Sequence, residues 1–110
     1  ATVMQERLPL KMAIIDNGYL GMIRQWQDVF YNQRFHHSHL VGPDFVKLAE
    51  AYGMLGLRVT EKSQARPAIE QAMAHEGPVL IDFVVESAEN VFPMVPQGSS
   101  LSEMLHEPID

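Results

Sequence analysis

The 110-residue chain is long enough for one small domain, and its composition, with 46% hydrophobic and 20% charged residues, is ordinary for a soluble globular protein. A formal net charge of −6 and the lack of a basic cluster argue against a nucleic-acid partner. The sequence has no cysteine, which excludes disulfides and thiolate metal sites, and no apolar run approaches the roughly 20 residues of a membrane span. We therefore expect neither a nucleic-acid nor a membrane partner.

The first eight residues are predicted to form the end of a helix that stops before Pro9, because proline disfavours helix at the residue before it. The chain opens at Ala1 without an initiator methionine or a helix cap, so we expect a cut fragment or the ordered remainder of a larger protein. Leu10 to Ile15 is an apolar run rich in branched residues, which is typical of a buried parallel strand. Asp16-Asn17-Gly18 then gives a turn signal.

A helix is predicted from about Gly21 to Tyr31 or Gln33, because the apolar residues fall on one helical face: Met22, Trp26, Val29 and Phe30. In open α/β sheets, ligands bind at the carboxyl ends of strands, where the turn at Asn17 lies. The neutral amide oxygen of Asn17 suits a hard cation such as Mg²⁺. The alternative is a connecting turn without a ligand, since Asn and Gly dominate turns for backbone reasons.

The polar loop after this helix contains three histidines, at positions 36, 37 and 39. Their spacing matches neither of the helical zinc patterns, and no cysteine or nearby acid completes a tetrahedral set. We therefore interpret His36, His37 and His39 as loop residues rather than metal ligands.

The next segment begins with Gly42-Pro43-Asp44, a helix start, and ends at Gly53, a natural C-terminal cap. The predicted buried face of this helix comprises Phe45, Leu48, Ala49 and Tyr52. Leu55 to Val59 is a short strand that suits a sheet edge because it includes Gly56 and Arg58.

A further helix is predicted over about residues 64 to 75, with Ser63 as its cap and Pro67 in its first turn. Its inward-facing residues are predicted to be Ile69, Ala72 and Met73. Val79 to Val85 is the most continuously apolar strand, interrupted only by Asp82.

After Glu86 the sequence becomes an irregular, proline-containing arm in which Ser100 to Glu103 fits a capping box for a last short helix. The whole pattern predicts an α/β fold with three layers, α/β/α, around a parallel sheet. The strands are expected in the order 10–16, 79–85, 55–59, because the most apolar strand suits the centre.

Several segments carry a resemblance to a known family. They are Ala13 to Gln27, Phe30-Tyr31-Asn32, Arg34 to Ser38, Pro43 to Gly53, Gly56 to Val59, Gly77 to Asp82 and Pro93 to Pro96. In these segments the chain resembles the thiamine-diphosphate enzymes and, within them, the catalytic subunit of acetolactate synthase (acetohydroxyacid synthase). The resemblance covers nearly all of this chain but only the last part of the family's chain.

The resemblance implies a thiamine-diphosphate-binding fold, with residues 1–86 as the C-terminal part of that domain and residues 87–110 as a C-terminal arm or lid. It implies that Mg²⁺ is bound by the Asn17 side chain and the Tyr19 backbone carbonyl. The implied cofactor-binding residues are Asn17, Gly18, Tyr19, Leu20, Gly21 and Met22. Asp16 departs from the family, because it stands where the first asparagine of an Asn-Asn pair is usual.

Met22 and Trp26 are implied to line the substrate channel, whereas their helical spacing alone would make them core residues. No catalytic residue is expected in this fragment. The family's Gly-Asp-Gly metal-binding segment would lie upstream of Ala1, and its activating glutamate belongs to another domain of a neighbouring subunit. The 110-residue fragment alone is therefore predicted to be inactive.

The implied activity is the condensation of pyruvate with pyruvate or 2-ketobutyrate in branched-chain amino acid biosynthesis, with thiamine diphosphate and Mg²⁺, and with FAD in the full-length enzyme. The implied partners are 2-keto acids, further catalytic subunits in a dimer or tetramer, and a small regulatory subunit. The implied location is the cytoplasm, or a plastid or mitochondrion in a eukaryote. Two alternatives remain open: another thiamine-diphosphate carboligase or decarboxylase, and a non-catalytic α/β interaction module.

Overall fold

The computed structural model describes residues 1–107 and divides into two compact units. The first unit combines residues 1–17 with residues 41–85, and the second combines residues 18–40 with the chain from Glu86 onward. Residues 108–110 of the predicted arm lie outside the described residues. In the described part of the chain, none of the helices has the length and apolar content that a membrane crossing requires.

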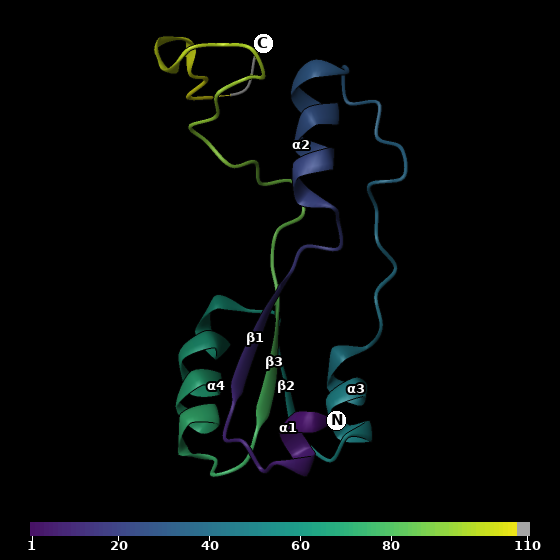
Figure 1. Cartoon of the computed structure of the whole chain (residues 1–110), viewed down its shortest axis with the longest axis vertical. Coiled ribbons are helices and arrows are strands. Elements are labelled where there is room, and N and C mark those ends of the chain that lie inside the picture. The colour runs from purple at the N-terminus through teal and green to yellow at the C-terminus, as the bar shows by residue number, and fades with distance from the viewer. Residues whose placement is uncertain (108–110) are drawn as a thin grey trace. The chain divides into compact units, whose positions relative to one another are not determined.

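The first unit is built on a three-stranded sheet whose strands are β1 (Lys11–Asp16), β2 (Leu55–Val59) and β3 (Val79–Val84). All pairs are parallel, and the order β1-β3-β2 places the last strand of the sequence at the centre (Figure 1). The first four residues of β3, from Val79 to Asp82, are all buried. The predicted strand order is confirmed, because β3 has the residues that need neighbours on both edges and both faces.

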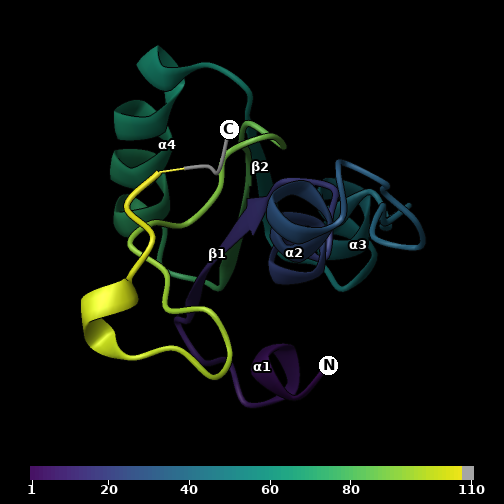
Figure 2. The same ribbon diagram turned by 90° about the horizontal axis from the view of Figure 1, so that it is seen from above.

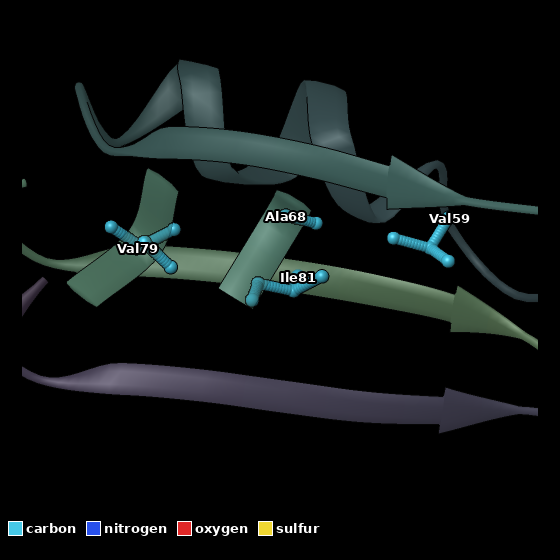
Figure 3. Packing of buried hydrophobic residues seen from close by; sticks show 5 residues of the cluster. Val59, Ala68, Val79 and Ile81 are labelled. Carbon is cyan, nitrogen blue, oxygen red and sulfur yellow. The ribbon is translucent and has the colours of Figure 1, made fainter. Parts of the chain in front are cut away.

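Two helices, α3 (Phe45–Ala51) and α4 (Lys62–Ala74), cover opposite faces of this sheet (Figures 1 and 2). The predicted three-layer arrangement is therefore confirmed. Figure 3 shows the core between α4 and the strands, where Ala68 of the helix lies over Val79 and Ile81 of β3 and Val59 of β2.

Side-chain and backbone caps fix the two ends of α3. The Asp44 carboxylate accepts hydrogen bonds from the N–H groups of Val46 and Lys47 at 3.1 and 3.2 Å. At the other end Gly53 has φ +75°, and the N–H groups of Gly53 and Met54 bond to the carbonyls of Glu50 and Ala49. These two hydrogen bonds form a Schellman motif, which confirms Gly53 as the C-terminal cap.

The predicted buried face of α3 is only partly correct. Ala49 is fully buried, but Leu48 and Tyr52 are exposed. A helix of seven residues presents only a narrow stripe to the sheet, and here the small Ala49 occupies it.

The predicted start of α4 is wrong, because Ser63 is inside the helix and not its cap. The Gln64 amide oxygen accepts from the N–H groups of Thr60 and Glu61 at 2.9 and 3.1 Å, so the helix begins at Lys62. Pro67 is consequently inside the helix, beyond the first turn where we expected it. There its missing N–H leaves the helical carbonyl four residues earlier without its usual donor.

The predicted inward face of α4 is also corrected. Ala72 is buried, whereas Ile69 is 48% and Met73 is 68% exposed. These two side chains line an open apolar groove of about 180 Å³ together with Met12 and Ala13 of β1. The small alanines of α4 therefore contact the sheet, and the larger apolar residues lie at its open side.

The first helix, α1 (Thr2–Gln5), ends before the predicted Leu8. Arg7 has φ +52°, and the N–H of Leu8 bonds back to the carbonyl of Val3 at 2.9 Å. The left-handed Arg7 ends the helix before Pro9 can, which is why the prediction based on proline placed the end too late.

A charged network joins β3, β2 and the cap of α3. Asp82 is 1% exposed, and its Oδ2 lies 3.0 Å from Nε of Arg58, its register partner on β2. Nη2 of Arg58 lies 2.7 Å from Oδ1 of Asp44. The N–H of Lys47 and, after it, the Arg58 guanidinium hold the pKa of Asp44 below its ordinary value of 3.8. Arg58 is thus the partner of a buried acid as well as a residue of an edge strand.

The second unit contains α2 (Gly21–Phe30), the loop to Leu40, the arm, and a 3-10 turn, η1 (Leu101–Glu103). The predicted capping box is confirmed, because Ser100 N–H donates to the Glu103 carboxylate at 2.7 Å. Two backbone hydrogen bonds between Met94 and Leu105 close the arm on itself. Within residues 87–107 the arm therefore has defined internal bonding, with η1 as its regular element.

Candidate functional site

The residues predicted to bind a cofactor and metal follow directly after β1. The carbonyl of Asp16, the last residue of β1, accepts from the N–H of Val85 at 2.9 Å, so β1 and β3 remain paired to their carboxyl ends. Asn17 comes next and is the last residue of the first unit. It therefore lies at the carboxyl end of a strand of the parallel sheet, the end at which open α/β folds bind their ligands.

Gly18 to Leu20 begin the second unit and pair with the end of the loop after α2. The carbonyl of Gly18 accepts from Leu40 N–H and the N–H of Leu20 donates to the Ser38 carbonyl, each at 2.8 Å. Gly18 has φ +67°, and a Cβ built on it would meet nothing within 4 Å, so the backbone conformation and not packing requires glycine. Backbone hydrogen bonds to the loop of the second unit therefore hold residues 18–20 of the turn.

The first turn of α2 is suited to an anion. No side chain caps this helix, whose N-cap position is Leu20, and its first turn contains no acidic residue. The N–H groups of Gly21 and Met22 consequently lie at the positive end of a helix dipole, and the first turn itself contributes no carboxylate to offset it. Such a helix start is a ready site for a phosphate group.

The two residues predicted to line a substrate channel differ in their packing. Met22 is 54% exposed, whereas Trp26 is partly buried and packs on Phe30 with ring centroids 4.9 Å apart. Met22 is therefore a surface residue, whereas Trp26 packs against Phe30, which lies one turn further along α2.

Sequence reasoning missed the most buried residue of α2, which is Gln25 at 2% exposure. Its amide bonds to Val91 in the arm, and the amide of Gln27 bonds in the same way to His36 in the loop. The signal in the sequence is a polar residue three positions after Met22, on the face that otherwise reads as apolar.

The histidine-containing loop is held by ring contacts. The rings of His36 and His37 have centroids 3.9 Å apart, and His39 lies edge-on to Tyr19 at 5.2 Å. Among residues 1–107 no group of three or more His, Cys, Asp and Glu residues could hold a metal ion.

Comparison with known proteins assigns the chain to a family. Residues 1–83 match the family described as thiamine pyrophosphate enzyme, C-terminal TPP binding domain. The chain belongs to the thiamine pyrophosphate enzymes.

Two similar thiamine pyrophosphate enzymes are acetolactate synthase large subunits. The one from Cyanidium caldarium is 45% identical over 106 residues, and the isozyme 2 large subunit from Escherichia coli is 42% identical over 107 residues. The alignments cover 94% and 96% of this chain but only 18% and 20% of the two relatives. This chain thus spans about a fifth of their length.

A solved structure shares the fold. The thiamine diphosphate-dependent 4-hydroxybenzoylformate decarboxylase of Rhodococcus jostii RHA1 superposes with a TM-score of 0.69 and 28% identity. The match covers 77% of this chain and 16% of the decarboxylase. The parallel sheet with helices on both faces is therefore the fold of a thiamine pyrophosphate enzyme domain.

The residues present fit the cofactor of a thiamine pyrophosphate enzyme. The start of α2 has neither a side-chain cap nor an acid to compete with a diphosphate. Mg²⁺ bound to phosphate needs few protein ligands, and Asn17 and Tyr19 offer neutral oxygens just before this helix. The hydroxyl of Ser38, which is buried beside this segment, has no hydrogen-bond partner within residues 1–107.

Proposed function

We propose that the chain is the C-terminal part of the catalytic subunit of an acetolactate synthase, which condenses pyruvate with pyruvate or 2-ketobutyrate in branched-chain amino acid biosynthesis. The observation that carries the proposal is the identity to acetolactate synthase large subunits over nearly the whole chain. The decarboxylase of the same fold is less similar and covers less of it. The domain match ending at residue 83 supports residues 1–86 as the cofactor-binding domain and residues 87–110 as its arm.

In this proposal Asn17 contributes its amide oxygen and Tyr19 its backbone carbonyl to Mg²⁺. Gly18, Leu20, Gly21 and Met22 bring backbone groups to the diphosphate, where the dipole of α2 favours negative charge. When bound, thiamine diphosphate supplies the chemistry for decarboxylation and carbon–carbon bond formation. This chain's own residues bind and orient the cofactor, and none of them is proposed as a catalytic acid or base.

The remaining proposals concern the complete enzyme. It would act on small 2-keto acids, carry FAD outside this chain, form a homodimer or homotetramer and associate with a regulatory small subunit. The association with a small subunit is supported by the names of the relatives, which call them large subunits. We propose a cytoplasmic location, with a plastid or mitochondrion as the eukaryotic equivalent.

We propose that Trp26 and Met22 line the channel for the acceptor 2-keto acid. In the complete enzyme, Trp26→Leu should change the ratio of products from pyruvate and 2-ketobutyrate by about tenfold, because an apolar contact discriminates a single methylene by such an amount. Competition between the two acceptors measures the ratio, and the thiamine diphosphate requirement should stay unchanged. An unaltered ratio would make Trp26 only a packing partner of Phe30.

Acetolactate formation from pyruvate tests the proposed function. The complete protein, supplied with thiamine diphosphate, Mg²⁺ and FAD, should form acetolactate, and the isolated 110 residues should form none. Release of an aldehyde without carbon–carbon bond formation would identify a decarboxylase instead. A complete protein that does not bind thiamine diphosphate would support the non-catalytic module.

A further inference from the structure

The arm is attached to α2 by a side-chain amide that pairs with the arm's backbone. Oε1 of Gln25 accepts from the N–H of Val91 at 2.8 Å, and Nε2 donates to the Val91 carbonyl at 2.9 Å. Nε2 also donates to Sδ of Met94 at 3.0 Å. Because Gln25 is 2% exposed, water cannot replace these partners, and both donors and the acceptor of the amide are satisfied within the protein.

Two neighbouring side chains of α2 strengthen the same attachment. Nη1 of Arg24 donates to the carbonyl of Ala88 at 3.2 Å. Nδ2 of Asn90 donates to the carboxylate of Asp28 at 2.6 Å. Residues 88–91 are therefore held at successive points by one helix.

The same helix contacts the turn proposed to bind the cofactor. The Arg24 guanidinium lies over the Tyr19 ring, 5.5 Å from its centroid, and over the Phe35 ring at 4.9 Å. The arm and the first turn of α2 are thus bonded to a single helix of ten residues, all within the second unit. This shared helix is the physical route that a coupling between the arm and the turn would take.

We infer that Gln25 is a positioning residue that fixes the arm to α2 and so couples the order of residues 88–94 to diphosphate binding at the first turn of that helix. The inference rests on the proposed function for its ligand, but the attachment of the arm does not depend on that ligand. Because coupling is reciprocal, bound thiamine diphosphate should also order the arm.

Gln27 provides a matched control on the same helix. Its Nε2 donates to the His36 carbonyl at 2.8 Å, and its Oε1 accepts from the His36 N–H at 3.2 Å. The chemistry is that of Gln25, but the partner is the loop and not the arm.

The experiment compares Gln25→Met with Gln27→Met in the complete enzyme. Hydrogen exchange without cofactor should become about 10–100-fold faster over residues 88–94 in Gln25→Met, because both backbone bonds to Val91 are lost. Gln27→Met should accelerate exchange only around His36. Gln25→Glu, which places a buried carboxylate against the Val91 carbonyl and the Met94 sulfur, should accelerate exchange over residues 88–94 at least as much as Gln25→Met.

The coupling is measured by adding thiamine diphosphate with Mg²⁺. In the wild type the cofactor should slow exchange over residues 88–94, and in Gln25→Met this protection should be largely lost and the calorimetric Kd raised severalfold. Unchanged exchange at 88–94 in Gln25→Met, or an equal change in Gln27→Met, would overturn the attachment. Faster exchange with an unaltered Kd would overturn the coupling.

A second variant, Asn90→Ala, separates these outcomes from misfolding of α2, because it alters only the arm side of the contact. It should accelerate exchange at residues 88–91 and weaken cofactor binding in the same direction, and the absence of both effects would contradict the inference. If the wild-type enzyme binds no thiamine diphosphate, the proposed function fails, while the exchange comparison still decides whether Gln25 holds the arm.

Discussion

Asn17→Ala in the complete enzyme is expected to raise the Mg²⁺ and thiamine diphosphate concentrations needed for half-activation by roughly 10–100-fold. Loss of a metal ligand should cost at least as much as loss of the partner that orients one, for which this range is typical. The substitution introduces no backbone strain, because Asn17 is not among the residues with positive φ. Activation curves with each ligand varied in turn measure the effect, and cofactor activation should be weakened far more than folding stability, which the unfolding temperature of the cofactor-free enzyme reports.

The matched control for Asn17 is its neighbour, Asp16→Asn. This change keeps the side-chain volume at the end of β1 and creates the Asn-Asn pair usual in the family, so the half-activation concentrations should stay close to those of the wild type. If Asn17→Ala left the Mg²⁺ dependence unaltered, or if Asp16→Asn were the more damaging change, Asn17 would not be the metal ligand.

Gly56→Ala is expected to destabilise the contact between β2 and α3 by about 2–3 kcal/mol. A Cβ at this position would lie 2.9 Å from the carbonyl oxygen and 3.0 Å from Cα of Val46, which are backbone atoms of α3 that cannot rotate away. Without this clash, alanine in a strand would stabilise by about 0.5–1 kcal/mol because glycine loses more backbone entropy. The sign of the result therefore tests the close approach of helix and strand.

Native-state hydrogen exchange of the β2 amides in the complete enzyme measures this free energy locally. Gly42→Ala is the control, because a Cβ there would meet only the Phe45 ring at 3.8 Å, which is ordinary contact. Equal stability changes in the two variants would show that α3 does not approach β2 as closely as the structure has it.

The sequence predicts the strand order correctly because the apolar residues of β3 are continuous. Val79 to Asp82 are buried one after another, and only a central strand between two helical layers offers such an environment. Helix boundaries were less predictable, because they depend on particular side-chain bonds. Gln64 starts α4 before Ser63, and the left-handed Arg7 ends α1 before Pro9 could.

The site was only partly predictable from sequence. The strand-turn-helix pattern, which follows from local periodicity, is present in the structure, and the assignment of Asn17 as a ligand within it stays a prediction. Gln25 was not found, because the buried face of α2 is set by the arm, which lies more than 60 residues further along the chain. Helical periodicity cannot show that a glutamine, and not Met22, faces inward.

The amides of Gln25 and Gln27 each pair with the main-chain N–H and carbonyl of one residue, Val91 and His36, and this has a consequence for how position 91 of the arm can vary. The Val91 side chain is 68% exposed and contributes nothing to the two bonds that its peptide groups make with Gln25. Position 91 can therefore accept any residue that has an N–H group, and only proline is forbidden. A substitution at position 91 can therefore change the surface chemistry of the arm without removing the two hydrogen bonds that hold it to α2.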